Sequence, residues 1–238
     1  MFLKSLILGA AFLALNCGPA KAQSQCDLEL VLAMDVSRSV NPTEFELLQH
    51  GTAEAFRAKE VIETIGWLHG GLMVTVTQWS GDEQQRQVVP WRLLSTPQSV
   101  LSFADEVDAM KRAFRFDLTA PGQALLQAES LGAGNPLVCR RRVIDISGDG
   151  IKNTGFDPAP IADDIALLGV TINGLVIRGD RPDPLEFYET QIARGPLSFV
   201  EIAEGFDDFP RAILKKLLRE LPPSLSELRR IPAASAPL

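Results

Sequence analysis

The sequence contains few residues of the kinds that build zinc sites and nucleic-acid interfaces. It has only two histidines, His50 and His69, among 238 residues, which argues against a zinc site built from histidine. Basic residues are outnumbered, with 23 Lys and Arg against 30 Asp and Glu, and the formal net charge is −7. A nucleic-acid binder needs a basic footprint, which this chain lacks overall. An acidic surface does not favour anionic lipid either, so neither nucleic acid nor membrane is expected as a partner.

Long apolar runs are also lacking. After the first 22 residues, no stretch reaches the ~18 apolar residues that a membrane helix needs. Near the start, Lys4 precedes an apolar run at 6–15, and Ala20-Lys21-Ala22 is a small-x-small cleavage site. This order predicts a signal peptide over 1–22, cleaved after Ala22. A lipoprotein signal ending at Cys17 is the alternative. The mature chain is expected to be periplasmic or secreted and to have no membrane span.

Cysteine is scarce, with three residues in the chain. Cys17 leaves with the predicted signal peptide, so the exported protein keeps Cys26 and Cys139. An even number of cysteines in an oxidising compartment suggests one disulfide. Two unrelated buried thiols are the alternative, and the count alone leaves both open.

Strand and helix patterns alternate along the rest of the chain, whose 46% hydrophobic and 22% charged residues are typical of a globular protein. Helix caps and prolines predict helices that begin near positions 41, 96, 119, 157, 183 and 208. Pro90 interrupts one predicted strand, which suits the edge of a sheet. Apolar or alternating runs predict strands at 28–34, 72–79, 87–94, 142–147, 170–177 and 198–203.

Strands separated by helices predict parallel pairing with right-handed crossovers. We therefore expect an α/β fold of three layers, in which a doubly wound, mostly parallel sheet is flanked by helices. The sequence shows no linker and no internal repeat, so residues 26–221 are expected to form one domain. Pro, Ser and Ala dominate 222–238, which predicts a frayed C-terminal tail.

Two polar motifs follow predicted strands. Asp35-Val36-Ser37-Arg38-Ser39 comes where the first strand stops, and Ser147-Gly148-Asp149-Gly150 ends a later one. In a parallel sheet, functional groups gather beyond the carboxyl ends of the strands. Carboxylates and hydroxyls together form an oxygen-rich ligand set of the kind that Mg²⁺ or Mn²⁺ prefers. The alternative is that these residues are strand-end turn residues that cap backbone groups.

These motifs resemble those of the von Willebrand factor A domain family. The metal-ion-dependent adhesion site of that family uses Asp-x-Ser-x-Ser, a Thr from a later loop and an Asp from a later strand end. Asp35, Ser37 and Ser39 match the first part, and Asp149 matches the last. Thr119 is the best candidate for the threonine, because it precedes a predicted helix between the two motifs. The resemblance covers nearly all of the mature chain and is closest to an exported bacterial subgroup of unassigned function.

The resemblance implies a function, a cofactor and a partner. Ser37, Ser39 and Thr119 would bind Mg²⁺ (or Mn²⁺ or Ca²⁺) directly, while Asp35 and Asp149 would hold it mainly through water. The open position would take an Asp or Glu from a partner protein. The expected protein is thus a binding module and not an enzyme.

The resemblance also bears on the cysteines. In this family the first and fourth strands are parallel neighbours. That placement would bring Cys26 and Cys139 together at the end of the sheet opposite the metal site, where they could form a disulfide.

Several alternatives accompany this interpretation. A Mg²⁺-dependent hydrolase could use Asp35 or Asp149, and a scaffold could keep a vestigial site. Asp117 is either an additional outer ligand or a solvated loop residue. Asp145, inside a predicted strand, is expected to be a buried acid paired internally, the alternative being an outer partner of the metal site. Arg178-Gly179-Asp180 has the spelling of an adhesion tripeptide, but nearby prolines suggest a plain turn.

Overall fold

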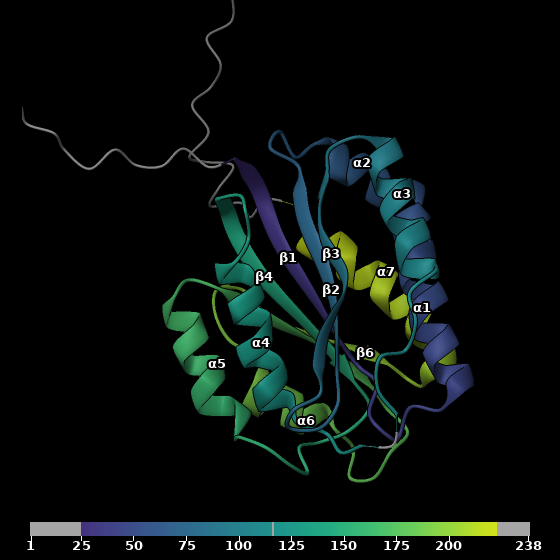
Figure 1. The fold of residues 1–238 in the computed structure, drawn as a ribbon, viewed down its shortest axis with the longest axis vertical. Helices are drawn as coiled ribbons and strands as arrows, with labels where there is room; N and C mark the ends of the chain where they lie inside the picture. Colours follow the sequence, from purple (N-terminus) through teal and green to yellow (C-terminus); the bar gives the residue numbers. More distant parts are fainter. Residues whose placement is uncertain (1–24, 116, 223–238) are drawn as a thin grey trace, which may run out of the picture.

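The computed structural model describes residues 25–115 and 117–222 (Figure 1). The predicted signal peptide over 1–22 lies outside the described residues, and so does the predicted tail beyond residue 222. Within the described ranges, no helix combines the length and the apolar character that crossing a membrane requires.

A six-stranded sheet forms the centre of the molecule, in the order β3-β2-β1-β4-β5-β6. Neighbouring strands are parallel except β2 and β3, which are antiparallel. Pro90 lies in the edge strand β3, as its sequence predicts. The strands are β1 (Cys26–Asp35), β2 (Leu72–Trp79), β3 (Gln85–Leu94), β4 (Cys139–Gly148), β5 (Thr171–Ile177) and β6 (Val200–Ala203).

Helices cover both faces of this sheet, which confirms the three-layer α/β prediction (Figure 1). One face packs against α1 (Pro42–Arg57), α2 (Lys59–Gly66), α3 (Pro97–Asp108) and α7 (Phe209–Glu220). The other packs against α4 (Pro121–Ala133), α5 (Pro158–Leu167), α6 (Leu185–Phe187) and the π-helical turn η1 (Tyr188–Ile192). Alternate residues of β1 enter the two cores, because side chains of a strand point to opposite faces.

The first helix begins as its sequence predicts. The Glu44 N–H donates to Asn41 Oδ1 at 3.0 Å, and the Asn41 N–H donates to Glu44 Oε2 at 2.7 Å, which completes a capping box. α2 is a helix that the sequence pattern does not separate from the first. It begins after Ala58, whose extended backbone breaks the helical path. The chain after α5 also differs from expectation, because the helix predicted near 183 is a three-residue helix followed by η1.

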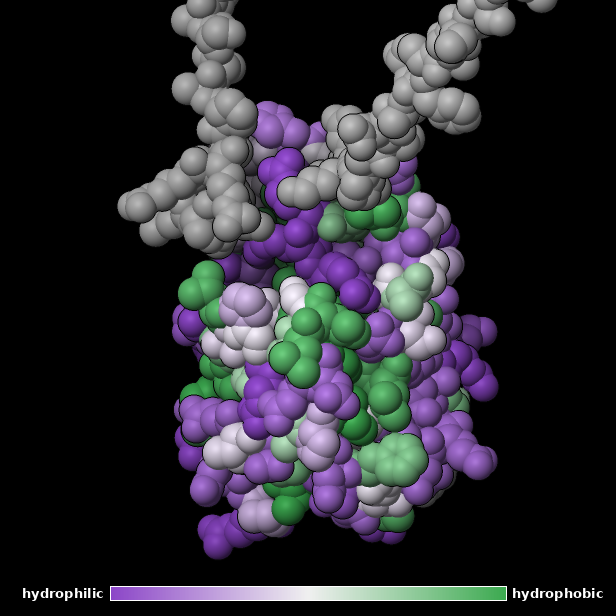
Figure 2. All heavy atoms as spheres, turned by 90° about the vertical axis from the view of Figure 1, so that its left-hand side faces the viewer, coloured by the Kyte–Doolittle hydropathy of each residue, from purple (hydrophilic) through white to green (hydrophobic). Residues whose placement is uncertain are grey.

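The surface on the α5 side of the sheet is mixed in character. Figure 2 shows apolar patches there, separated by polar side chains. Leu167 and Leu168, at the end of α5, are 86% and 62% exposed. Scattered exposure of this kind is ordinary for a soluble domain.

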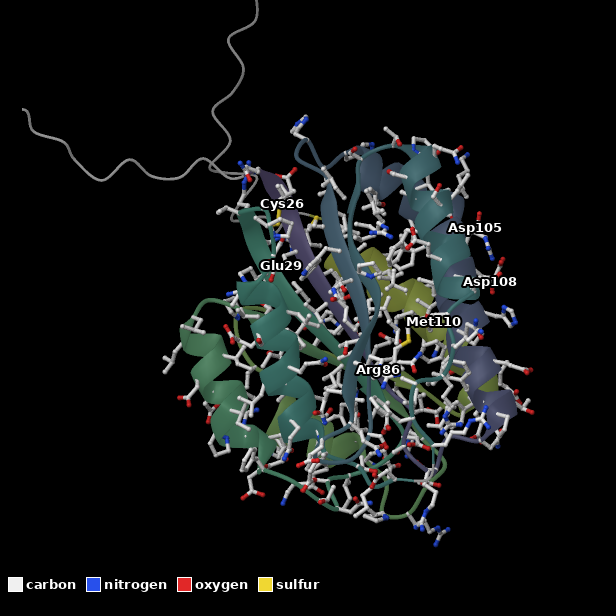
Figure 3. All side chains as sticks on the ribbon, in the orientation of Figure 1. Cys26, Glu29, Arg86, Asp105, Asp108 and Met110 are labelled. Carbon is white, nitrogen blue, oxygen red and sulfur yellow. A yellow bond between two sulfur atoms is a disulfide. The ribbon has the colours of Figure 1, made fainter. Side chains whose placement is uncertain are left out.

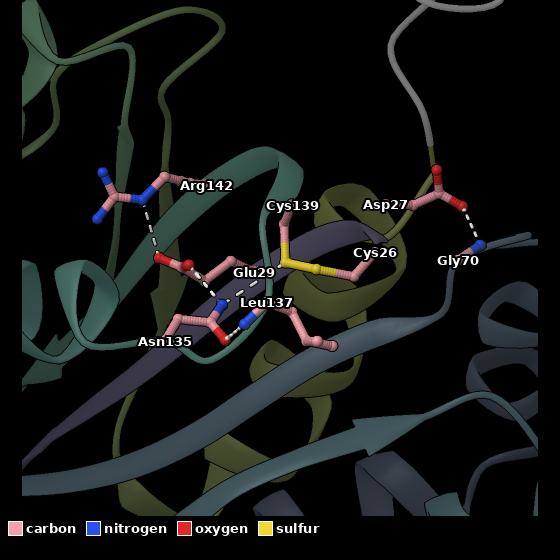
Figure 4. Close-up of a disulfide and its surroundings, with 8 residues drawn as sticks. All are labelled: Cys26, Asp27, Glu29, Gly70, Asn135, Leu137, Cys139 and Arg142. Atoms are coloured by element: carbon pink, nitrogen blue, oxygen red, sulfur yellow. Dashed lines mark hydrogen bonds and ion pairs between the residues drawn. A yellow bond between two sulfur atoms is a disulfide. The ribbon is translucent and has the colours of Figure 1, made fainter. Parts of the chain in front are cut away.

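A disulfide links Cys26 and Cys139, as the family resemblance implies (Figure 4). The two residues are paired in the register of β1 and β4, and their Cα atoms are 4.4 Å apart. Figure 3 places Cys26 and Glu29 toward one end of the sheet, away from the loops at the carboxyl ends of the strands. A structural disulfide fits a protein that resides outside the reducing cytosol.

Candidate metal centre

Three loops bring the predicted site residues together beyond the carboxyl ends of β1 and β4. Asp35 is the last residue of β1, and Ser37 and Ser39 follow it. Asp149 comes directly after β4, and Thr119 lies two residues before α4. Parallel neighbours end at the same edge of a sheet, so the two aspartates meet although 113 residues separate the strand starts.

Hydrogen bonds join the polar side chains of these loops. The Ser39 hydroxyl donates to Asp149 Oδ1 at 2.8 Å, and the hydroxyl oxygens of Ser37 and Ser39 are 3.2 Å apart. The Thr119 hydroxyl donates to Ser37 Oγ at 3.3 Å. The Ser37 N–H donates to Asp35 Oδ1 at 2.7 Å. All five residues that the sequence singles out therefore belong to one connected cluster, called here the hydroxyl–carboxylate cluster.

Burial makes ionisation of the two carboxyl groups of the cluster unfavourable. Burial and the charge of Asp149 raise the pKa of Asp35 to about 8. Burial also raises the pKa of Asp149 to about 6, against the lowering effect of the Ser39 hydrogen bond. Asp35 Oδ2 is buried and has no hydrogen-bond partner among the described residues. A cation nearby would relieve each of these costs, because an opposite charge favours the ionised carboxylate.

The donor set suits a hard divalent cation. It consists of hydroxyl and carboxylate oxygens, which Mg²⁺, Mn²⁺ and Ca²⁺ accept. It contains no imidazole or thiol: His50 lies on α1 against Asp108, and the described cysteines form the disulfide. Within the part of the chain that the structure describes, no three His, Cys, Asp or Glu side chains are grouped so that they could hold a metal.

Asn153 fixes the loop that carries Thr119, and sequence reasoning missed it. Its side-chain Oδ1 accepts from the Thr119 N–H at 2.7 Å, and its own N–H donates to the Thr119 carbonyl at 3.1 Å. Asp117 lies in the same loop. Its Oδ1 accepts from the adjacent Leu118 N–H at 2.7 Å, and its carbonyl accepts from the Arg38 N–H at 2.9 Å. These bonds hold the loop, and Asp117 also lines a cleft that contains Ser39 and Thr119.

Arg112 holds the loop that carries the two serines through hydrogen bonds. The sequence analysis did not identify this residue either. Its Nη2 donates to the carbonyls of Val36 and Ser37 at 2.8 and 2.9 Å, while its Nε donates to the Phe114 carbonyl at 2.8 Å. The segment after α3 thereby supports the Asp-x-Ser-x-Ser turn. The neighbouring Arg38 is exposed and lines a cleft that also contains Ser39 and Thr119.

Tyr188 lies beside the cluster, close to Gly148 at the end of β4. It begins η1 and is fully buried, and its hydroxyl has no hydrogen-bond partner among the described residues. A side chain at Gly148 would lie within 2.5 Å of that hydroxyl. No spacing in the sequence marks this residue, because η1 follows a short irregular stretch.

Asp145 is an internally paired acid, as predicted, and not part of the cluster. It is buried on β4, and its Oδ2 lies 2.7 Å from the Nζ of the fully buried Lys216 on α7. Burial raises the pKa of Asp145 to about 7, although Lys216 lowers it. Arg178, from the adhesion-like tripeptide, forms ion pairs with Asp183 and Glu204.

The sheet order and its helical layers correspond to a known fold. A sheet in the order β3-β2-β1-β4-β5-β6, with helices on both faces, is the α/β fold of von Willebrand factor A domains, and in this chain an Asp-x-Ser-x-Ser turn follows β1. The chain belongs to the family described as "Protein of unknown function (DUF1194)", whose model matches residues 25–225. Among curated proteins, none matches its sequence.

Solved structures share this fold at low sequence identity. A von Willebrand factor type A protein from Catenulispora acidiphila has a TM-score of 0.58 and 21% identity, over 82% of this chain and 43% of that chain. BatB from Bacteroides thetaiotaomicron has a TM-score of 0.55 and 16% identity, over 82% of this chain and 98% of that chain.

A third similar structure is proximal thread matrix protein 1 from the mussel byssus, described with a zinc-occupied MIDAS motif. Its TM-score is 0.57 and its identity 17%, over 82% of this chain and 48% of that chain. This chain spans about half the length of the byssus protein. At these identities the likeness establishes the shared fold.

Proposed function

We propose that this protein is an exported, divalent-cation-dependent protein-binding module. Ser37, Ser39 and Thr119 would hold Mg²⁺ (or Mn²⁺ or Ca²⁺) directly, and Asp35 and Asp149 would hold it mainly through water. The bound cation would supply an electrophilic position for an Asp or Glu of a partner protein. Residues 26–221 would form the binding domain, after removal of a signal peptide at Ala22.

The convergence of the hydroxyl–carboxylate cluster is the observation that carries this proposal. The Ser37 hydroxyl lies 3.2 Å from that of Ser39 and 3.3 Å from that of Thr119, which belongs to a second loop, and the Ser39 hydroxyl bonds to Asp149. Turn residues that merely cap backbone groups would not need a hydroxyl from a second loop. The zinc-occupied motif in the byssus protein, on the same fold, supports the assignment.

The composition of the cluster favours binding over hydrolysis. The two acids of the cluster, Asp35 and Asp149, are the groups proposed to hold the cation. Neither histidine of the chain lies in the cluster. A hydrolase would need a further general base to activate water.

Thermal unfolding tests the metal site. We expect Mg²⁺, Mn²⁺ or Ca²⁺ to stabilise the wild type relative to EDTA, by about 2.7 kcal/mol at 100 times the dissociation constant. Ser37→Ala and Asp149→Ala should lose that stabilisation. The controls are Ser130→Ala and Asp164→Asn, because both residues are exposed on helices, α4 and α5, and neither belongs to the cluster. Equal stabilisation of the wild type and the cluster variants would reject the site.

The proposed binding of a partner protein needs a separate measurement. Immobilised wild-type protein should retain a binding partner from exported proteins in Mg²⁺ and release it in EDTA. Ser37→Ala should retain none of it, while Ser130→Ala should behave as the wild type. Turnover of a phosphoester or peptide substrate in Mg²⁺, lost in Ser37→Ala, would replace this function by a hydrolase.

A further inference from the structure

A groove of about 550 Å³ lies beside the hydroxyl–carboxylate cluster. It runs between the start of α1 and the segment that follows α3, which passes Met110, labelled in Figure 3. Its charged lining comprises four cations, Arg38, Lys111, Arg112 and Arg115, against one acid, Glu46, and its apolar lining includes Pro42 and Phe45. We call it the basic groove.

Three of the four cations named for the basic groove have no acidic partner among the described residues; the fourth, Arg112, bonds to backbone carbonyls. Arg38, Lys111 and Arg115 are exposed and form no ion pair with another described residue. Cations elsewhere are usually paired, as Arg57 is with Asp105 and Asp108. In a chain whose net charge is −7, the groove is a local excess of positive charge. Like charges held together favour an incoming anion.

Arg38 connects the groove to the cluster. It stands between Ser37 and Ser39, and it lines both the basic groove and a cleft of about 420 Å³ that contains Ser39 and Thr119. A peptide whose carboxylate reaches the cluster can therefore continue over Arg38 into the groove without leaving the surface.

The opposite side of the cluster has the opposite charge. A hollow of about 520 Å³ there is lined by acids that include Glu44, Asp149, Glu204 and Asp207. The arginine in that lining, Arg178, is already paired with Asp183 and Glu204. An acidic peptide would be repelled on that side, so the charge pattern sets the direction in which it leaves the cluster.

We propose that the basic groove binds an acidic segment of the partner protein that carries one apolar side chain. This rests on the proposed function: one Asp or Glu of the segment reaches the metal centre. Its neighbouring acidic residues pass over Arg38 to Lys111 and Arg115, and the apolar side chain packs against Pro42 and Phe45. The segment is thus selected by charge beyond the single carboxylate at the metal.

Fluorescence anisotropy with a labelled oligoglutamate peptide that carries one central leucine tests this proposal. We expect the peptide to bind the wild type in excess Mg²⁺ at low ionic strength. Lys111→Glu/Arg115→Glu should weaken binding about tenfold or more, because reversed charges at an interface repel an acidic ligand. The control Lys59→Glu/Arg140→Glu changes the net charge equally at sites that do not line the groove, and should bind as the wild type. A glutamine version of the peptide should bind neither.

The same samples separate the groove from the metal site. Lys111→Glu/Arg115→Glu should keep the full thermal stabilisation by Mg²⁺, because neither side chain belongs to the cluster. If no cation stabilises the wild type but the peptide still requires Lys111 and Arg115, the proposed function fails and the groove stands. If the double variant binds the peptide as tightly as the control, or the wild type does not bind it, the groove proposal is overturned. A wild-type dimer that the double variant loses in light scattering would make a second copy the occupant, which also overturns it.

Discussion

Tyr188 and Asp35 place two buried oxygen atoms against the same point of Gly148. A Cβ added to that glycine would lie 2.5 Å from the Tyr188 hydroxyl and 2.9 Å from Asp35 Oδ2. Neither oxygen has a hydrogen-bond partner among the described residues. Because Gly148 has no side chain, both oxygens can approach the end of β4 there, and the phenol is the group that we expect to donate to the free oxygen of Asp35.

Tyr188 should therefore position Asp35 when a cation is bound. Groups that hydrogen-bond to metal-binding carboxylates typically change metal affinity by 10–100-fold when removed. We expect Tyr188→Phe to weaken Mg²⁺ binding about tenfold, measured by calorimetry, while leaving the Tm in EDTA nearly unchanged. Tyr188 is the single tyrosine of the chain, so any tyrosine band in an ultraviolet difference spectrum comes from this residue. Mg²⁺ should produce a tyrosine difference band in the wild type, and unchanged affinity in Tyr188→Phe would contradict this role.

The raised pKa of Asp35 predicts how the stability of the metal-free protein depends on pH. A carboxyl group with a higher pKa in the folded state binds more protons there than in the unfolded state. The free energy of unfolding therefore falls as pH rises from 3.8 to about 8. The side chain of the Asp35→Asn variant cannot ionise. In EDTA, the free energy of unfolding of this variant should therefore rise relative to that of the wild type, by up to ~1.4 kcal/mol per pH unit across that interval. Urea unfolding at several pH values measures this difference.

Cation binding should reverse this trend, because the cation binds the ionised carboxylates and displaces their protons. Calorimetry in two buffers of different ionisation enthalpy should show proton release when Mg²⁺ binds near neutral pH. Asp164→Asn serves as the control, since Asp164 is exposed. If Asp35→Asn and the wild type show parallel pH profiles in EDTA, the carboxyl group of Asp35 is not held at a raised pKa.

The parts of the site that the sequence predicts are those tied to strand ends. Asp35 and Asp149 each follow an apolar strand, and parallel strands end at one edge, so the motifs alone indicate that they meet. No pattern in the sequence indicates that Arg112 and Asn153 support the site. They act through backbone groups of Val36, Ser37 and Thr119 that lie 34 or more residues away in the sequence. Contacts of that kind depend on tertiary packing, which no local period encodes.

The sequence also predicts the main features of the fold, because they too follow from local patterns. Alternating strands and helices indicate a parallel sheet, and Pro90 indicates its edge. The boundary between α1 and α2 was missed because Ala58, where the helix breaks, is a good helix former. Its extended backbone is imposed by the packing of both helices on one core. Lys216 was likewise indistinguishable in sequence from an exposed helix lysine such as Lys215.

Lys216 should anchor α7 to the sheet. Its Nζ lies 2.7 Å from Asp145 Oδ2 and 2.5 Å from Glu220 Oε1, and all three residues are buried. Removing one partner of a buried ion pair leaves an uncompensated charge and costs roughly 3–5 kcal/mol. We expect that loss for Lys216→Met in urea unfolding. The adjacent Lys215 is 65% exposed and pairs with Glu201, so Lys215→Met should cost less than about 1 kcal/mol. Similar losses for the two variants would show that α7 does not depend on the buried pairs.

The disulfide should stabilise the fold without affecting the metal centre. Cys26 and Cys139 are 113 residues apart in the sequence, and the chain-entropy model gives about 4–5 kcal/mol for closing a loop of that length. We expect the free energy of unfolding of Cys26→Ala/Cys139→Ala in urea to fall by up to that amount, and reduction of the wild type to lower it comparably.

The bridge joins the starts of β1 and β4, whereas the cluster follows their ends. Mg²⁺ should therefore bind the folded double variant with wild-type affinity. We expect this because the register of the two strands is sufficient to set the spacing of Asp35 and Asp149. A loss of Mg²⁺ affinity in the folded variant would mean that the disulfide sets this spacing instead.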